Sequence, residues 1–187
     1  MKKFFLTLAA IMCCAMTTAV FTSCGGDDSG NSGGGGGEED LTTPAAAVLT
    51  FSFTFNDETL NYFDMTAEYF DELGAIKSES ITSKKWEKTV VSMLPAKLGV
   101  RLKATLKTDL DDDEIYSFKW LYAYTCMIVN KKGNSLGEYS KSINGVTGFP
   151  DRTGRHIKEK LANMSDGVVY ALVYEVDSKG KKVESSW

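Results

Sequence analysis

Strict alternation of apolar and polar side chains over residues 98–107 constrains this chain more than any other feature. The apolar members are Leu98, Val100, Leu102, Ala104 and Leu106. The polar members between them include Arg101, Lys103, Thr105 and Lys107. Successive side chains of a β-strand point to opposite faces, so this period of two predicts a strand with one buried face.

Similar segments recur along the chain and are separated by short polar turns. We therefore expect about nine strands and an all-β fold. Residues 75–82 are more polar than the others and are expected at a sheet edge. The strands are predicted over residues 48–55, 60–70, 75–82, 84–93, 98–107, 115–130, 135–143, 168–176 and 182–187.

The segment 115–130 is almost continuously apolar and aromatic. As one straight strand it would extend ~53 Å, far beyond a usual strand. We therefore predict that it bends, or crosses from one sheet to the other through a β-bulge.

One segment departs from the period of two. Ile157, Leu161 and Met164 follow helical spacing, which predicts a short helix within residues 152–164, capped by Asp151 or Thr153. The glycine- and proline-containing residues 145–150 before it are predicted as a loop.

Alternating strands without βαβ units favour two stacked antiparallel sheets. Around residues 166–170 the chain resembles the corner of an immunoglobulin-like domain, with Tyr170 able to hydrogen-bond back across that corner. The resemblance implies that Trp120 is the core tryptophan and that Ala104 and Leu172 replace the two cysteines. The prediction is an immunoglobulin-like antiparallel β-sandwich with one short helix before a late strand. An eight-stranded lipocalin-like barrel is the alternative left open.

The amino terminus has the form of a cleaved signal, because Lys2 and Lys3 precede an uncharged apolar run from residue 4 to residue 21. The sequence at 21–24 resembles a bacterial lipobox, in which Cys24 is lipidated after cleavage. Asp27 and Asp28 follow, as in Bacteroidota surface lipoproteins. The resemblance implies anchoring in the outer membrane and display at the cell surface.

These features divide the chain into three parts. Residues 1–23 are expected to be a lipoprotein signal peptide, and residues 24–44 a lipidated cysteine with a disordered glycine-rich tether. Residues 45–187 are expected to form the β-sandwich domain, which has the size of a single domain.

Charge and cysteine content restrict the function classes. Loss of Lys2 and Lys3 with the signal takes the net charge from −4 to −6, so no nucleic-acid partner is expected. Only Cys126 is left as an unmodified thiol, and its apolar surroundings predict burial. No nucleophile–base arrangement or cofactor motif is present, and the single histidine argues against a zinc site. We expect a protein that is not an enzyme and has no cofactor.

Two groups of residues are candidates for ligand contact. The acidic loop 109–114 offers Asp109, Asp111 and Asp113 as weak candidate Ca²⁺ ligands, although a solvated turn is favoured and no metal site is predicted. The aromatic candidates, placed near loops and expected to be more exposed than Phe118 and Trp120, are Tyr122, Tyr124, Tyr139 and Trp187.

The function favoured by these observations is a non-catalytic surface binding or accessory module, with glycan as a candidate ligand. The alternative is a structural or protein-interaction component of the outer envelope that pairs through a sheet edge. An exposed aromatic patch would favour the first hypothesis, and a long, uncharged, unpaired edge strand the second.

Overall fold

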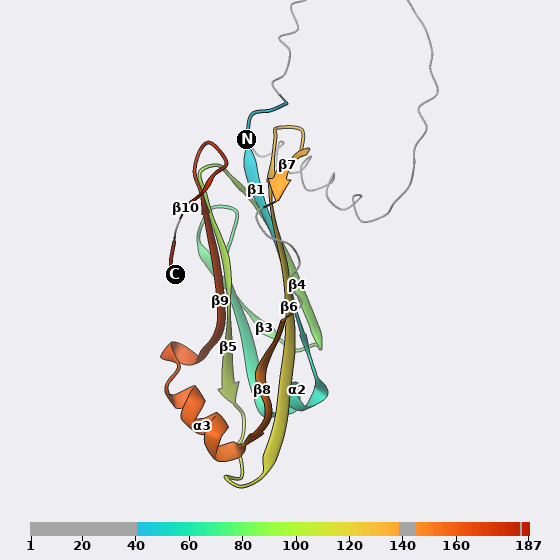
Figure 1. The fold of residues 1–187 in the computed structure, drawn as a ribbon, viewed down its shortest axis with the longest axis vertical. Helices are drawn as coiled ribbons and strands as arrows, with labels where there is room; N and C mark the ends of the chain where they lie inside the picture. The colour runs from blue at the N-terminus through green and yellow to red at the C-terminus, as the bar shows by residue number, and fades with distance from the viewer. Residues whose placement is uncertain (1–40, 139–144, 184) are drawn as a thin grey trace, which may run out of the picture.

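Two antiparallel sheets pack face to face in the computed structural model (Figure 1), which describes residues 41–138, 145–183 and 185–187. The prediction of an all-β sandwich with one short helix before a late strand is confirmed. The lipocalin-like alternative is wrong, because the strands divide into two separate sheets.

The described residues contain ten strands, two α-helices and one 3-10 helix. The strands are Ala46–Phe55 (β1), Phe63–Phe70 (β2), Ile76–Ile81 (β3), Lys85–Met93 (β4), Ala96–Leu106 (β5), Ile115–Val129 (β6), Ser135–Glu138 (β7), Gly145–Thr153 (β8), Val168–Val176 (β9) and Lys182–Val183 (β10). The helices are Asp57–Tyr62 (α2), Gly154–Ala162 (α3) and Ser165–Gly167 (η1).

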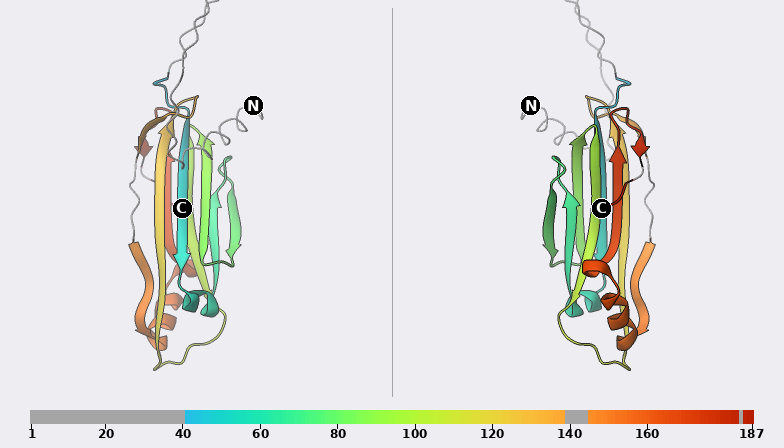
Figure 2. Two further views of the ribbon diagram at one scale, coloured as in Figure 1. Left: turned by 90° about the vertical axis from the view of Figure 1, so that its right-hand side faces the viewer. Right: turned by 90° about the vertical axis from the view of Figure 1, so that its left-hand side faces the viewer.

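One sheet, here called sheet A, has the order β4-β1-β6, and both β7 and β8 pair with the outer edge of β6. The other, sheet B, has the order β10-β9-β5-β2-β3. The polar strand predicted at an edge is β3, which is confirmed. The sandwich therefore has two long sides, one formed by β3 and β4 and the other by β6, β8 and β9 (Figure 2).

The core lies between the sheets and is formed by the alternating apolar residues. Leu102 and Trp120 are 0% and 1% exposed, so both predicted core positions are confirmed. Phe53 of β1 and Phe63 of β2 are buried from opposite sheets. Burial of large side chains such as these supplies most of the favourable free energy of folding in a domain of this size.

The long apolar segment is a single strand, β6, that stays in sheet A over its full length. The predicted crossing between sheets is wrong. The strand can be this long because its two ends use different partners: its first half pairs with β8 and its last residues with β7. The predicted bulge is present in weaker form, as a register shift between Tyr116 and Phe118.

Residues 145–153 form strand β8, so the predicted loop at 145–150 is also wrong. The glycines there serve close packing against β6. A Cβ at Gly148 would lie 2.4 Å from the Phe118 carbonyl oxygen and 3.1 Å from the Trp120 ring. A glycine within a strand often marks such a close approach.

The immunoglobulin-like strand correspondence requires correction at Ala104 and Leu172. The disulfide of an immunoglobulin domain joins the two sheets, whereas Ala104 and Leu172 lie on β5 and β9, which are neighbours in sheet B. Trp120 lies in sheet A rather than in the sheet of Tyr170. No described residue forms a hydrogen bond with the Tyr170 hydroxyl, and its ring points into the sandwich instead.

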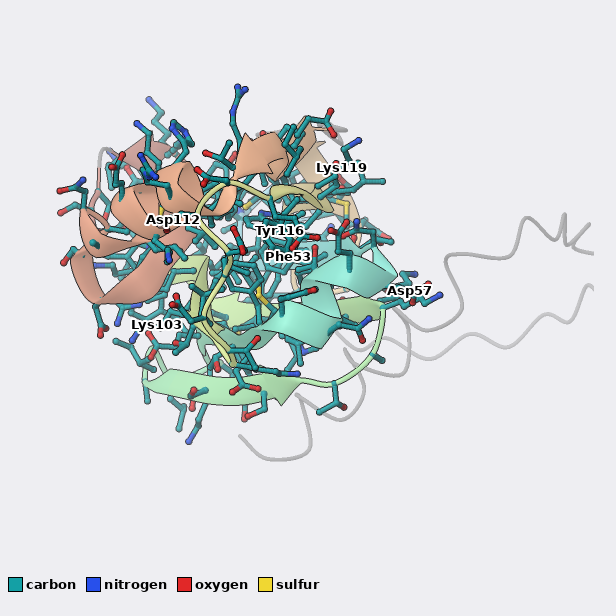
Figure 3. The ribbon with its side chains drawn as sticks, turned by 90° about the horizontal axis from the view of Figure 1, so that it is seen from below. Phe53, Asp57, Lys103, Asp112, Tyr116 and Lys119 are labelled. Carbon is teal, nitrogen blue, oxygen red and sulfur yellow. The ribbon has the colours of Figure 1, made fainter. Side chains whose placement is uncertain are left out.

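The helices close one end of the sandwich. Residues 60–62, predicted to begin a strand, belong instead to α2. Asn56 caps this helix and also donates a hydrogen bond to the Ser117 carbonyl, which ties the helix to β6. Thr153 caps α3, as predicted, and Ile157 on the inner face of this helix is buried. Figure 3 views this end, with Tyr116 near its centre and Asp57, Lys103 and Lys119 toward its margin.

Candidate functional site

Four tyrosines meet along the β6–β9 side of the sandwich, and we call them the tyrosine cluster. Tyr122 and Tyr124 come from β6, and Tyr170 and Tyr174 come from β9 in the opposite sheet. The ring centroids of Tyr122 and Tyr170 are 4.5 Å apart, and those of Tyr124 and Tyr174 are 6.1 Å apart. Two of the predicted contact residues are thus brought together with two that were not predicted as contacts.

The cluster faces inward yet is only partly buried. Tyr122, Tyr124 and Tyr170 keep part of their surface exposed, although residues before and after them on the same faces, such as Trp120 and Cys126, are fully buried. Buried aromatic rings pair in this way in many cores. Here Tyr122, Tyr124 and Tyr170 keep some exposed surface, whereas Tyr174 is buried.

Burial raises the pKa of two tyrosines in the cluster. Burial, together with the neighbouring tyrosines, raises the pKa of Tyr170 well above its usual value. Burial and a hydrogen bond with Tyr174 raise the pKa of Tyr124. Tyr124 and Tyr170 therefore offer neutral hydroxyls rather than phenolates at physiological pH.

A lysine lies beside the cluster. The Nζ of Lys182 lies 4.3 Å from the centroid of the Tyr174 ring, a cation–π distance. On the other flank, a Cβ at Gly145 would lie 2.6 Å from the Tyr122 ring, so only glycine lets β8 approach that ring without displacing it. The cluster is thus bordered by the ammonium group of Lys182 on one flank and by the backbone of Gly145 on the other.

The opposite side of the sandwich is closed by a polar network around Glu79. Its carboxylate accepts hydrogen bonds from the Tyr69 hydroxyl, from Trp86 Nε1 at 3.1 Å and from Lys88 Nζ at 2.6 Å. Hydrogen bonds from Lys88 and Tyr69 lower the pKa of Glu79. The polar groups on this side form hydrogen bonds with one another. Among the described residues, no comparable network around a charged side chain covers the tyrosine side.

Trp187 does not join the tyrosine cluster. It stacks on Phe70 at 4.5 Å, with the Arg101 guanidinium 4.9 Å above its ring, on the outer face of sheet B. Lys97 donates a hydrogen bond to the Ser186 carbonyl, which holds this segment on the sheet. The predicted final strand is therefore limited to Lys182–Val183. Tyr139 lies outside the described residues.

Helix α3 forms ion pairs with three of the five carboxylates of the acidic loop. Lys158 contacts Asp109 at 3.2 Å and Asp112 at 2.7 Å, and Arg155 contacts Asp113 at 3.4 Å. Asp111 instead accepts a hydrogen bond from the Asp113 amide. Within the described ranges, no group of three or more potential metal-ligating side chains is present.

Cys126 is a buried free thiol, as predicted. Burial raises its pKa to about 11, so it carries little of the nucleophilic thiolate at neutral pH. Cys24, the predicted lipidation site, lies outside the described residues.

The outer strands of the sheets carry charged side chains. Lys85, Glu87 and Lys88 lie along β4, and Lys77 and Glu79 lie along β3. Charged residues on edge strands discourage pairing with another chain.

The tyrosines of β9 were missed as contact residues for a clear reason. Tyr170 and Tyr174 share a face at even spacing, which the sequence displays. The amino-acid sequence contains no pattern that indicates that β9 lies opposite β6.

Comparison with known proteins adds no family to this description: no family model matches the chain, and no curated protein matches it significantly. In the part of the chain that the structure describes, no helix has the length and apolar character required to cross a bilayer.

Proposed function

We propose that this chain is a non-catalytic surface binding module and that the tyrosine cluster contacts its ligand, which we take to be a glycan. The observation that carries the proposal is the partial exposure of inward-facing rings from two sheets, with Lys182 beside them. On the opposite long side of the sandwich, the polar side chains around Glu79 are instead occupied by hydrogen bonds to one another.

The chemistry of tyrosine suits a carbohydrate. A tyrosine ring offers an apolar face to the C–H groups of a pyranose, and its hydroxyl exchanges hydrogen bonds with sugar hydroxyls. Binding sites of this kind combine apolar surface with a few placed polar groups. Neutral phenols that both donate and accept are consistent with an uncharged, hydroxyl-rich ligand.

We also propose that the module is held at the outer membrane by lipid on Cys24 and is displayed at the cell surface. The support is the basic head, apolar run and lipobox-like 21–24, followed by Asp27 and Asp28. Cys24→Ala should then appear in the supernatant after an alkaline wash of membranes. Retention of the variant with the membranes would contradict the lipid anchor.

Pairing through a sheet edge is the weaker alternative. Strand β4 is nine residues long, but Lys85, Glu87 and Lys88 place charge along it. Such an edge opposes strand addition. No observation on the described strands specifically favours an envelope-protein partner.

A glycan array tests the proposal. The full chain, purified in detergent, is labelled and applied to an array of oligosaccharides and polysaccharides, with heat-unfolded chain as the control. We expect the folded chain alone to bind at least one glycan class, and free glycan of that class to compete. Absence of any glycan binding by the folded chain would contradict the proposed ligand class.

A further inference from the structure

A small pocket lies at the end of sheet B that carries α2, on the β2–β3 edge and away from the tyrosine cluster. Its volume is about 220 Å³. Three apolar and five polar residues line it, among them Leu60, Asp64, Thr66, Ser80 and Lys107. A water occupies on the order of 30 Å³ in the liquid, so the space corresponds to about seven waters, or to a ligand the size of one sugar ring.

The pairing of β2 with β3 fixes the position of the lining. Thr66 lies opposite Ser80 in the register, and Met65 lies opposite Ile81. Side chains alternate along a strand, so Thr66 and Ser80 lie on the face opposite to the buried Met65 and Ile81, and the partly buried Leu60 of α2 supplies the apolar surface. Asp64, Thr66 and Ser80 are therefore presented by a regular pair of strands, and Lys107 follows the end of β5.

The polar groups of the pocket retain unused hydrogen-bonding capacity. Lys107 Nζ donates to the Leu60 carbonyl at 2.8 Å but lies 3.6 Å from Asp64 Oδ1, which is beyond hydrogen-bond distance. An ammonium group has three N–H donors, so Lys107 keeps donors beyond the one that binds the Leu60 carbonyl. Across the described residues, the Asp64 carboxylate accepts no hydrogen bond, and the side-chain hydroxyls of Thr66 and Ser80 form none.

We propose that this pocket binds a neutral, polyhydroxylated ligand of monosaccharide size. A ligand hydroxyl can accept a hydrogen bond from Lys107 while donating one to Asp64, because a hydroxyl does both. Further hydroxyls reach Thr66 and Ser80, and the ligand's C–H surface rests on Leu60. A phosphate or other strong anion is disfavoured by the Asp64 carboxylate. The site is separate from the tyrosine cluster and does not depend on it.

Saturation-transfer NMR on the full chain in deuterated detergent tests this inference. The probes are methyl glycosides of glucose, galactose, mannose and N-acetylglucosamine, with glycine and serine as zwitterionic comparisons. We expect at least one glycoside to bind. Ser80→Val and Asp64→Asn should each weaken its affinity about tenfold, the equivalent of one lost hydrogen bond to a charged or buried group.

The control is Ser78→Val, on the same strand and face as Ser80 but outside the lining. It should leave glycoside affinity unchanged. Tyr124→Ala should also leave it unchanged, which separates this pocket from the proposed tyrosine site. The inference is overturned if no glycoside binds, if binding is equal in Ser80→Val and Ser78→Val, or if only the amino acids bind.

Discussion

At the residue scale, the two long sides of the sandwich differ in how their polar atoms are satisfied. Glu79 collects donors from Tyr69, Trp86 and Lys88 and closes one side. The tyrosines of the other side keep exposed surface. A satisfied network favours rigidity, and exposed rings favour contact with a ligand.

The Glu79 network predicts a defined pH dependence of stability. Hydrogen bonds from Lys88 and Tyr69 hold the pKa of Glu79 below its ordinary value of 4.5 in the folded chain. Because the folded pKa is the lower one, this stabilisation is complete above about pH 4.5 and is lost as the pH falls through the folded pKa. Urea unfolding between pH 3 and 6 should show a shallower decline for Glu79→Gln than for the wild type.

Glu87→Gln is the matched control, because Glu87 lies on the neighbouring β4 edge and pairs only with Lys85 in the described structure. Its unfolding free energy should follow the wild-type pH profile. A Glu79→Gln profile that also coincides with the wild type would show that the network contributes nothing through ionisation.

At the element scale, strand β8 depends on glycine for its close approach to β6. Gly148 has φ +118°, and a Cβ there would meet the Phe118 carbonyl oxygen at 2.4 Å. Gly148→Ala should lower the free energy of unfolding by about 2–4 kcal/mol, through strained backbone and overpacking. Urea denaturation measures this loss.

Gly137→Ala on β7 provides the comparison, since a Cβ at Gly137 meets nothing within 4 Å. The change there should stay under ~0.5 kcal/mol. Equal losses for the two variants would mean that β8 does not pack on β6 as described.

Strands β5, β8 and β6 show why some elements could be predicted from the sequence and others could not. The strand at residues 98–107 was predictable, because a strand with one buried face has alternating apolar and polar residues. Residues 145–150 were not, because glycine and proline have two meanings: they form turns, and they also permit close packing in an edge strand. The length of β6 depended on β7 and β8, whose pairing no local pattern reveals.

At the scale of the whole molecule, half of the tyrosine cluster could be predicted. Tyr122 and Tyr124 follow one face of an aromatic strand, which the spacing displays. Their partners come from β9 in the other sheet, and sheet membership is a property of the fold. Trp187 was placed among the contact residues for its aromatic character, but it packs on Phe70 instead.

The architecture separates the proposed functions in space. The tyrosine cluster lies along one long side, the Glu79 network along the other, and the β2–β3 pocket near the end that carries α2. The described chain begins at residue 41, at the opposite end from α3 (Figure 1). A tether at that end would leave both proposed ligand sites accessible.

The affinity of tyrosine variants for the glycan that the array identifies tests the central claim most directly. Tyr124→Ala should weaken binding roughly fivefold or more, because stacking on an aromatic ring supplies about 1 kcal/mol or more. Tyr62→Ala, at an aromatic contact with Tyr116 beside α2, should leave affinity unchanged in chain that remains folded by circular dichroism. Unchanged affinity in Tyr124→Ala, or a loss confined to Tyr62→Ala, would contradict a binding site at the tyrosine cluster.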